Sequence, residues 1–283
     1  MKYLIIGSKG QLGKCFEENM EENNLNFLGV GIEEMDITDK VAISEVFEKV
    51  RPNIVINCSA YNLVDQAEET PEMAYRVNKE GVRNIAEECK KHNCFLVHYG
   101  TNYIFDGTKN SPYTESDKPN PINKYGESKL AGERIIQERL NEGSYLIFRL
   151  SWLYGKGHQN FIYKFLQRVK NGDILMGTED EISTPTSTET VVKVTMRALR
   201  EDLPGDIYHL TNTGQTSRWG WAKKILETIN DSTELQKVSV EKFNLPAKRP
   251  KNAVLDNSKI LKDLDIHITS WDKEVEKFIK KKL

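Results

Sequence analysis

The chain has 283 residues, and its 40 Lys and Arg residues against 42 Asp and Glu residues give a formal net charge of −2 at pH 7. This balance excludes a generally basic protein that coats nucleic acid. Hydrophobic residues make up 38% of the chain, which is enough for a large core, and no biased tract indicates wholesale disorder. We therefore expect one large domain or two unequal ones.

The first residues and the cysteines favour a soluble protein of a reducing compartment. The first apolar run, Tyr3–Ile6, meets Gly7 at once and is much shorter than the roughly 20 residues of a membrane span. The four cysteines lack paired CxxC spacing and lie in or beside apolar runs, as reduced core residues do: Cys15, Cys58, Cys89 and Cys94. We expect a cytoplasmic protein without a metal site.

Short apolar strands alternate with helical patterns through the first half of the chain. The expected strands are residues 3–6, 26–30, 54–56, 95–97 and 146–148. The expected helices are residues 11–20, 41–50 and 71–91, the last with Thr70 as N-cap and Pro71 at its first position. Because parallel strands need helical crossovers, this alternation predicts an α/β fold with a Rossmann-type, doubly wound parallel sheet.

The second half has a weaker pattern. Its predicted elements are helices at residues 161–169, 190–199 and 219–229, a strand at 207–210, and a final amphipathic, Lys-rich helix. We expect residues 1–150 to form a Rossmann domain, joined by elements from about 188–212. Residues 151–187 and 213–283 would form a smaller substrate domain that completes a cleft.

Three glycines follow the first predicted strand and lead into a helix. They are Gly7, Gly10 and Gly13, in the spacing G-x-x-G-x-x-G. Glycines at such a place let the backbone turn tightly and approach a pyrophosphate, whose charge then faces the positive end of the helix. Although turns use glycine for many reasons, the strand before and the helix after favour a dinucleotide-binding domain.

The end of the second predicted strand leaves the phosphate state of the cofactor open. An acidic residue there binds the ribose hydroxyl of NAD, whereas a basic residue accepts the 2′-phosphate of NADP. Here the strand ends in Gly29-Val30-Gly31, without either charge. We expect Asp36 at the adenine edge, or as a cap for the helix that begins at Val41, and both NADPH and NADH stay open.

Tyr125 and Lys129 lie four residues apart at the start of a predicted helix, and therefore on one face. An ammonium near a phenol lowers the tyrosine pKa, which makes proton donation to a developing alkoxide feasible nearer neutral pH. Such a pair alone is more often a solvated helix face. Three features support catalysis: Thr101 follows the fourth strand at the carboxyl edge, small residues end the third strand, and Asn78 is an amide that needs a partner.

Together these residues resemble the extended branch of the short-chain dehydrogenase/reductase superfamily that acts on nucleotide sugars. The sequence is similar to the dTDP-4-dehydrorhamnose reductase family over nearly its whole length, and the motifs are specific as a set. In chain order they are Gly10–Gly13, Asp36–Asp39, Ala60–Tyr61, Val64–Glu68, Thr101–Gly107, Pro112–Glu115, Tyr125–Glu133, Arg149–Gly155, Asn160–Phe161, Thr184–Thr186 and Arg249–Pro250.

The resemblance implies hydride delivery from NADPH or NADH to the C4 ketone of a dTDP-linked 4-keto-6-deoxy sugar, above all dTDP-4-dehydrorhamnose, which would give dTDP-L-rhamnose. It implies that Tyr125 donates the proton, that Lys129 lowers its pKa and binds the nicotinamide ribose, and that Thr101 orients the carbonyl. The implied cofactor-binding residues are Gly7, Gly10, Gln11, Leu12, Gly13, Asp36, Ile37, Cys58, Ser59 and Ala60, with Tyr125 and Lys129.

Five further residues are implied at the substrate: Asn102, Tyr103, Trp152, Asn160 and Arg249. A guanidinium fork suits phosphate oxygens, so Arg249 is a candidate contact of the diphosphate. Two plainer interpretations stay open, Trp152 as domain-interface core and Arg249 as an ordinary surface cation.

Two departures from the family pattern fall where the sugar would bind. The family's Ser-Thr-Asp-Tyr reads Gly100-Thr101-Asn102-Tyr103, and its Asp-Gln-x-Gly before the Pro-Thr pair reads Glu-Asp-Glu-Ile-Ser at residues 179–183. Neither change touches the proton donor. The sequence therefore predicts the C4-ketone reductase class more firmly than the identity of the sugar.

Other functions remain as alternatives. A dehydratase would need an Asp-Glu pair after the threonine, and Asn102-Tyr103 does not supply it. A related epimerase or reductase with a different sugar stays open, as does a non-catalytic, nucleotide-binding regulatory subunit. We expect no nucleic-acid or membrane partner; a homodimer is a further hypothesis, with acidic pairs such as Glu17-Glu18 at the contact, although a solvated helix face is favoured there.

Overall fold

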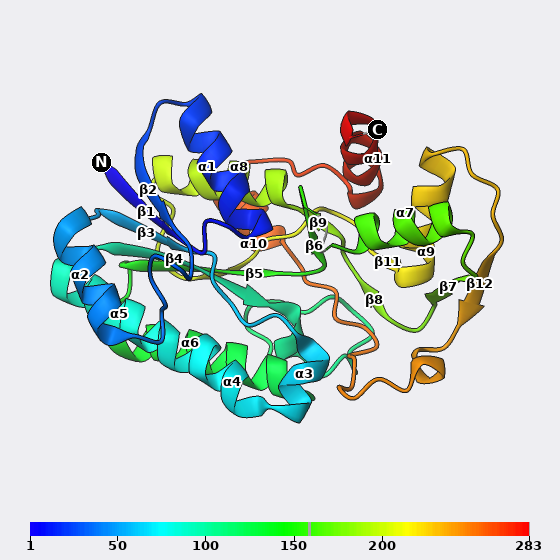
Figure 1. Ribbon diagram of the computed structural model, residues 1–283, viewed down its shortest axis with the longest axis horizontal. Helices are drawn as coiled ribbons and strands as arrows, with labels where there is room; N and C mark the ends of the chain where they lie inside the picture. Colours follow the sequence, from blue (N-terminus) through cyan, green and yellow to red (C-terminus); the bar gives the residue numbers. More distant parts are fainter. Residues whose placement is uncertain (158–159, 283) are drawn as a thin grey trace.

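Six parallel strands form the centre of the computed structural model, which describes residues 1–157 and 160–282 (Figure 1). Their order is β10-β5-β4-β3-β1-β2, and every neighbouring pair is parallel. The strands are β1 Lys2–Ile6, β2 Asn26–Val30, β3 Ile54–Asn57, β4 Phe95–Thr101, β5 Tyr145–Leu150 and β10 Ile207–His209. The winding reverses between β1 and β3, which confirms the predicted doubly wound α/β fold.

Helices cover both faces of this sheet (Figure 1). One face carries α1 Gln11–Glu22, α8 Thr188–Arg200 and α10 Ser258–Asp263, and the other carries α2 Lys40–Val50, α5 Val82–His92 and α6 Lys124–Arg139. In β1, Ile5 belongs to the core cluster of the first face, whereas Leu4 and Ile6 belong to that of the second. Since both faces are buried, the strands read as continuous apolar runs instead of alternating ones.

The predicted helix over residues 71–91 contains an unpredicted break. It consists of α4 Pro71–Tyr75, a π-helical stretch at Arg76–Gly81, and α5. Two short helices were also not predicted, α3 Val64–Glu69 and a 3₁₀ turn at Asn102–Ile104. Pro71 occupies the first helical turn as expected, but the Thr70 hydroxyl donates to the Gln66 carbonyl at 3.0 Å instead of capping α4.

A second, smaller group of elements lies beside the carboxyl end of the sheet. It contains helices α7 Phe161–Asn171, α9 Arg218–Thr228 and α11 Trp271–Lys282, and the parallel pair β7 Leu175–Thr178 and β12 Leu235–Val238. Two-residue strands join it: β6 Leu153–Tyr154 with β9 Thr186–Ser187, and β8 Ile182–Ser183 with β11 Thr216–Ser217, while a 3₁₀ turn spans Val240–Phe243. Its own core surrounds Trp221 and Tyr154.

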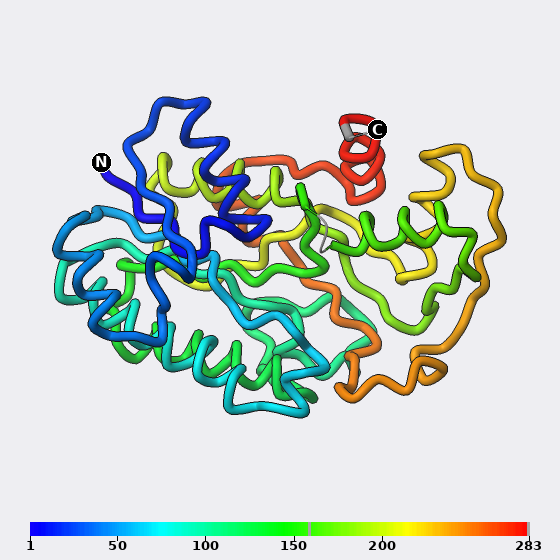
Figure 2. The backbone as a smooth tube through the Cα atoms, viewed as in Figure 1, coloured from blue at the N-terminus to red at the C-terminus, as the bar shows by residue number. Residues whose placement is uncertain are grey.

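The chain passes between the two halves more than once (Figure 2). Residues 188–212 return to the large half, where β10 is an edge strand of the sheet. Ile260, Leu264 and Ile268 also pack into the sheet's core, so a later stretch joins the large half as well. Residues 258–268 therefore pack with the large half, and the division of the chain into a Rossmann domain and a smaller substrate domain stays a prediction. Within residues 1–157 and 160–282, no helix has the length and apolar composition needed to cross a bilayer.

Helix α6 closely approaches the π-helical stretch Arg76–Gly81 at Gly132. A Cβ atom at this position would lie 2.2 Å from the Asn78 carbonyl oxygen, which is backbone and cannot rotate away. We expect Gly132→Ala to lower the free energy of unfolding by about 1–3 kcal/mol. This loss is expected even though alanine is intrinsically about 1 kcal/mol more favourable than glycine inside a helix. Urea-induced unfolding measures this, with Gln137→Ala on the exposed face of α6 as the control. Equal stability of the two variants would contradict the close contact.

Candidate active site

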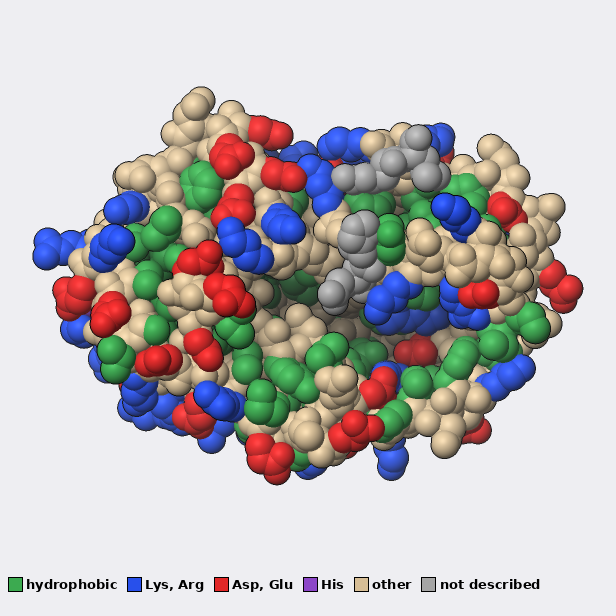
Figure 3. All heavy atoms as spheres, viewed as in Figure 1, with side chains coloured by type: hydrophobic (Ala, Val, Ile, Leu, Met, Phe, Trp, Pro, Cys, Tyr) green, Lys and Arg blue, Asp and Glu red, His purple; other side chains and the backbone are tan. Residues whose placement is uncertain are grey.

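A cavity of about 300 Å³ opens at the carboxyl edge of the sheet, where the winding reverses. Parallel α/β sheets place ligands at this point. In the space-filling view, the face of Figure 3 is hollowed between the two halves of the molecule. The cavity brings together the predicted residues Gly10, Gln11, Leu12, Cys58, Ser59, Ala60, Thr101, Tyr125, Lys129 and Trp152.

The glycine turn after β1 has the shape that a pyrophosphate requires. Gly7 has φ +77°, a conformation that favours glycine, and a Cβ atom at Gly13 would lie 2.4 Å from the Gly7 carbonyl oxygen. A Cβ atom at Gly10, by contrast, would meet only the Gly7 carbonyl, at 3.3 Å. Helix α1 starts here with no side chain capping its first amides. These amides and the open side of Gly10 therefore fit the diphosphate of a dinucleotide.

The turn after β3 is fixed by Asn78, which lies in the π-helical stretch and is buried. Its Oδ1 accepts from the Tyr61 amide at 2.9 Å, and its Nδ2 donates to the Tyr61 carbonyl at 3.0 Å and to Ser128 Oγ at 2.9 Å. The sequence indicated that this amide needs partners, and the structure confirms it. The turn and helix α6 are thereby held together.

Thr101, Tyr125 and Lys129 meet at the cavity from β4 and α6. Asn123 caps α6 by accepting from the Gly126 amide at 2.8 Å, so Tyr125 lies in the first turn of the helix. The Tyr125 hydroxyl shares a hydrogen bond with the Thr101 side chain and contacts Asn62 Oδ1 at 3.5 Å. Lys129 Nζ donates to the Tyr99 carbonyl at 2.6 Å. Asn62 was not predicted.

The tyrosine pKa differs from the expectation. Burial raises the pKa of Tyr125 to about 12, against the lowering effect of the Thr101 hydrogen bond. Desolvation outweighs any stabilisation of the phenolate here, because the Lys129 ammonium is directed at the Tyr99 carbonyl. Tyr125 is consequently protonated at neutral pH, which is the form that a proton donor needs.

Lys129 is itself held near its titration point. Burial lowers the pKa of Lys129 to about 8, and the carboxylate of Glu133 opposes this shift. Glu133 is ion-paired with Arg149 at 2.9 Å, and both side chains are almost inaccessible to solvent. Lys129 is therefore charged at neutral pH but loses its charge in mildly alkaline solution.

An arginine that the sequence analysis missed lies on the substrate side. The guanidinium carbon of Arg218, at the start of α9, lies 3.9 Å from the ring centre of Trp152, and Arg218 hydrogen-bonds the Tyr103 side chain. Trp152 also stacks on Trp221 at 5.7 Å, and the Tyr103 ring meets Tyr125 edge-on at 5.8 Å. The spacing around Arg218 is that of any first helical turn, so no local signal singles it out.

Arg249 lies outside the first cavity and already has a partner. Its two terminal nitrogens donate to Asp65 at 2.8 and 2.7 Å, and its Nη1 also donates to the Ala247 carbonyl. The side chain is 10% exposed, so it is not an ordinary surface cation. Asp65 comes from α3 of the large half, and this ion pair joins the two halves.

Several predicted ligands use their polar groups within the protein. Asn160 caps α7 by accepting from the Tyr163 amide at 3.1 Å, and it donates to the Gly155 carbonyl at 2.7 Å. This role explains why Asn160 is buried, and it differs from the expected sugar contact. The signal was present in the sequence, because Asn before a helical run is a common N-cap.

The predicted adenine-edge residues show a similar difference. Asp36 accepts from the Thr38 amide at 2.8 Å, while the cap of α2 is Asp39, so the second interpretation of Asp36 was wrong. The Ile37 side chain is in the core, and its carbonyl accepts from Asn84 at 2.9 Å. Ile37 could therefore contact a cofactor only through its backbone.

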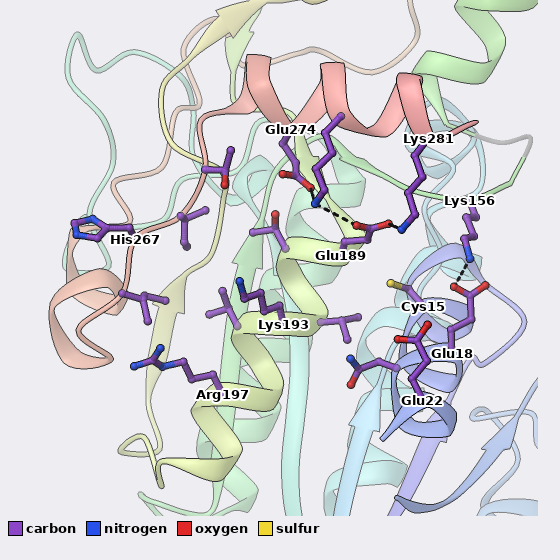
Figure 4. Close-up of a pocket in the computed structure, with 18 of the residues that line it drawn as sticks. Cys15, Glu18, Glu22, Lys156, Glu189, Lys193, Arg197, His267, Glu274 and Lys281 are labelled. Atoms are coloured by element: carbon purple, nitrogen blue, oxygen red, sulfur yellow. Dashed lines mark hydrogen bonds and ion pairs between the residues drawn. The ribbon is translucent and has the colours of Figure 1, made fainter. Parts of the chain in front are cut away.

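A second cavity, of about 490 Å³, lies between α1, α8 and α11 and shares no lining residue with the first (Figure 4). Two ion pairs lie among its charged side chains, Lys156 with Glu18 and Lys281 with Glu189. Within the part of the chain that the structure describes, no group of three His, Cys, Asp or Glu side chains is placed to hold a metal ion. We therefore place the candidate site at the first cavity, where the glycine turn meets Thr101, Tyr125 and Lys129.

Comparison with known proteins shows the family of the chain. The family described as the RmlD substrate binding domain matches residues 1–283. The chain belongs to this family. A dTDP-4-dehydrorhamnose reductase from Salmonella typhimurium is 32% identical, covering 99% of this chain and 97% of that protein.

Solved structures show the same likeness. A dTDP-4-dehydrorhamnose reductase from Bacillus anthracis in complex with NADP superimposes with a TM-score of 0.95 at 33% identity, covering 99% of both chains. A UDP-glucose 4-epimerase from Thermus thermophilus in complex with NAD reaches a TM-score of 0.83 over 100% of both chains, but at 18% identity it shows only a shared fold.

The two departures from the family pattern touch each other in the structure. Asn102 Nδ2 donates to Ser183 Oγ at 2.9 Å and to the Ala253 carbonyl at 3.0 Å, and the side chain is buried. Both amide hydrogens therefore hold β8 and the segment after Arg249, a structural role that differs from the expected sugar contact. The altered amide suits its protein neighbours, because an aspartate would face a carbonyl oxygen with negative charge.

We expect Asn102→Asp to lower the free energy of unfolding by about 1–3 kcal/mol at neutral pH, because a carboxylate cannot donate to Ala253. A protonated aspartic acid can donate, so the folded state raises its pKa. The defect should therefore be small near pH 4 and grow as the pH rises through that raised value. Urea unfolding at pH 4.5 and 8 tests this.

Asn53→Asp is the matched control. The exposed Asn53 uses its oxygen, which accepts from the Lys2 amide at 2.7 Å, and a carboxylate retains that role. A pH-independent loss in Asn102→Asp, or an equal loss in the control, would show that the contact with Ala253 is not the cause.

Proposed function

We propose that this protein reduces the C4 ketone of a dTDP-linked 4-keto-6-deoxy sugar with a reduced nicotinamide dinucleotide, and that it converts dTDP-4-dehydrorhamnose to dTDP-L-rhamnose. The observation that carries the proposal is the meeting of Thr101, Tyr125 and Lys129 at one cavity beside the glycine turn. The names of the similar reductases and the NADP bound by the one from Bacillus anthracis support it.

The roles follow from the protein's own groups. The bound cofactor would supply the hydride. Tyr125, protonated and partly buried, gives its proton to the carbonyl oxygen as that oxygen gains charge, and Thr101 hydrogen-bonds the same oxygen. The Lys129 ammonium has three N–H donors and uses one of them on the Tyr99 carbonyl. The other two would be available to the ribose of the cofactor, and the positive charge would favour the tyrosinate left behind.

The substrate side offers two arginines and an aromatic surface. Arg218 and Arg249 suit the diphosphate because a guanidinium group can bind phosphate oxygens. The charge of Glu181 acts on both arginines, so the two lie in the same region. Asp65 must then give up part of its hold on Arg249. The Tyr103 ring contacts Tyr125, and Trp152 contacts Arg218, so the sugar ring would lie near these two aromatic side chains.

The proposal covers both phosphate states of the cofactor. At the end of β2, Glu34 Oε2 accepts from the Gly31 amide at 2.8 Å, and the Lys9 side chain also packs against Gly31. A carboxylate suits the ribose hydroxyls of NADH, and an ammonium suits the 2′-phosphate of NADPH. The sequence showed no charge at Gly31 because both groups arrive from neighbouring turns. A homodimer and a cytoplasmic location stay predictions.

One assay separates the reductase from its alternatives. Purified protein is mixed with reduced nicotinamide dinucleotide and a panel of dTDP-4-keto-6-deoxy sugars, and cofactor oxidation is followed with product analysis. Stoichiometric oxidation with dTDP-L-rhamnose as product supports the proposal. An altered sugar with no net oxidation indicates an epimerase, and cofactor binding without turnover indicates a regulatory subunit.

Removal of the Tyr125 hydroxyl tests the proton donor. We expect Tyr125→Phe to lower kcat by about 10²–10⁴-fold, because general acid catalysis contributes on that scale. The dissociation constant of the reduced cofactor should change little, because the ring stays. Tyr3→Phe, at the other end of the sheet, is the control. Turnover at the wild-type rate in Tyr125→Phe would remove Tyr125 from the mechanism.

The pH dependence of cofactor use tests Lys129. Its pKa of about 8 means that the ammonium is present below that pH and is lost as the pH rises through it. We therefore expect kcat/KM for the cofactor to fall above about pH 8. Lys129→Met should lower kcat/KM and abolish this inflection, whereas Lys124→Met, at a partly exposed ion pair with Glu127, should keep it. An unchanged inflection in Lys129→Met would assign it to another group.

A further inference from the structure

A buried histidine that the proposed reaction does not use lies beside the end of β3, next to the turn that lines the cavity. His98 is on β4, 1% exposed, and it is the register partner of Asn57 at the end of β3. Its Nδ1 lies 3.0 Å from Asn57 Nδ2. The sequence analysis did not single out His98, and it included Asn57 only among the small residues that end the third strand.

The polarity of this contact is fixed by Ser59. The Ser59 amide can only donate, and it donates to Asn57 Oδ1 at 3.0 Å, as does the Ser59 hydroxyl. Asn57 must therefore turn its NH₂ group toward His98. It follows that His98 Nδ1 accepts and carries no proton, so the neutral ring carries its proton on Nε2.

The surroundings keep the ring in this neutral state. Burial lowers the pKa of His98 well below its usual value, and the positive charge of Lys129 adds to this shift. A proton on Nδ1 would also set two donors against each other. Among the described residues, Nε2 has no hydrogen-bond partner. Because an unpaired buried N–H costs free energy, stability alone does not account for a histidine here.

Through Ser59, Asn57 holds the turn after β3, residues 58–60, against the glycine turn. Ser59 is packed against the glycine turn, since a Cβ atom at Gly7 would lie 2.8 Å from the Ser59 nitrogen. The Cys58 amide donates to the Ile6 carbonyl at 2.9 Å. Cys58, Ser59 and the glycine turn thus line one side of the same cavity.

We propose that His98 is a positioning residue for the cofactor: as a neutral acceptor it orients Asn57, and Asn57 holds residues 58–60 against the glycine turn. The inference rests on the proposed cofactor site. It deepens that proposal by assigning the alignment of the two turns to a residue that does not touch the cofactor.

Two substitutions separate the acceptor from the bulk of the ring. His98→Asn keeps an acceptor oxygen close to the position of Nδ1, whereas His98→Leu keeps apolar bulk and removes the acceptor. We expect His98→Leu to raise the dissociation constant of NADPH and of NADH, and the KM of the cofactor, about five- to tenfold, the scale of one lost hydrogen bond. The KM of the sugar should stay unchanged, and His98→Asn should recover most of the affinity.

Leu96→Ala is the matched control, because Leu96 lies two residues earlier on the same face of β4 and has no polar role. It should lower the melting temperature without changing cofactor affinity in the folded protein. Fluorescence titration of the reduced cofactor gives the affinities. Wild-type affinity in His98→Leu, an equal loss in His98→Asn, or an equal loss in Leu96→Ala would each overturn the proposal.

A measurement on the unaltered protein decides the case even where a variant does not fold. The ¹⁵N chemical shifts of the His98 ring distinguish the two neutral tautomers and the imidazolium. We expect the Nε2–H tautomer at neutral pH, and a proton on Nδ1 would overturn the proposal. If wild-type protein binds no reduced nicotinamide, the proposed function fails, whereas the tautomer still reports on the contact with Asn57.

Discussion

The buried amide of Asn78 is the contact on which the geometry of the candidate site depends. One side chain satisfies both backbone groups of Tyr61 and also reaches Ser128, whose hydroxyl donates to the Tyr125 carbonyl at 2.8 Å. The turn that lines the cavity and the helix that carries the proton donor are therefore fixed to each other. Movement of either part would leave a buried polar group unpaired, which costs free energy, so the arrangement is rigid. Gly132 permits it, because only glycine lets α6 come this near to the Asn78 carbonyl.

Two arginines and two carboxylates form a cluster of charges that links the two halves of the molecule. Arg249 is held by Asp65, and the charge of the buried Glu181 acts on both Arg249 and Arg218. The four side chains together carry no formal net charge, so the arginines keep their places without an uncompensated buried charge. An incoming diphosphate would compete with these carboxylates for the same guanidinium groups. If these arginines bind the diphosphate as proposed, the affinity for a nucleotide sugar is a difference between two sets of ion pairs.

The sequence predicted the elements well and the partners of polar side chains poorly. Short-range patterns gave the sheet, the glycine turn and the Tyr125–Lys129 pair, because periodicity and turn chemistry act within a few residues. The π-helical stretch was missed because its apolar periodicity is close to that of an α-helix. Asn160 was assigned to the sugar by resemblance, although it caps its own helix. Arg218 and His98 were not found, since their partners lie far away in the chain and only the fold brings them together.

The departures from the family pattern acquire a common explanation in the packing. Gly100 replaces a serine, and a Cβ atom there would lie 2.2 Å from Glu133 Oε1, a carboxylate held by Arg149. Asn102 replaces an aspartate and bonds Ser183, which belongs to the other altered segment. Gly100 and Asn102 thus each have a neighbour inside the protein that accounts for the change, so neither change by itself indicates a lost activity. Gly100 lines the cavity beside Thr101, whereas Asn102 and Ser183 are buried, and none of these changes removes the Tyr125 hydroxyl that a reductase requires.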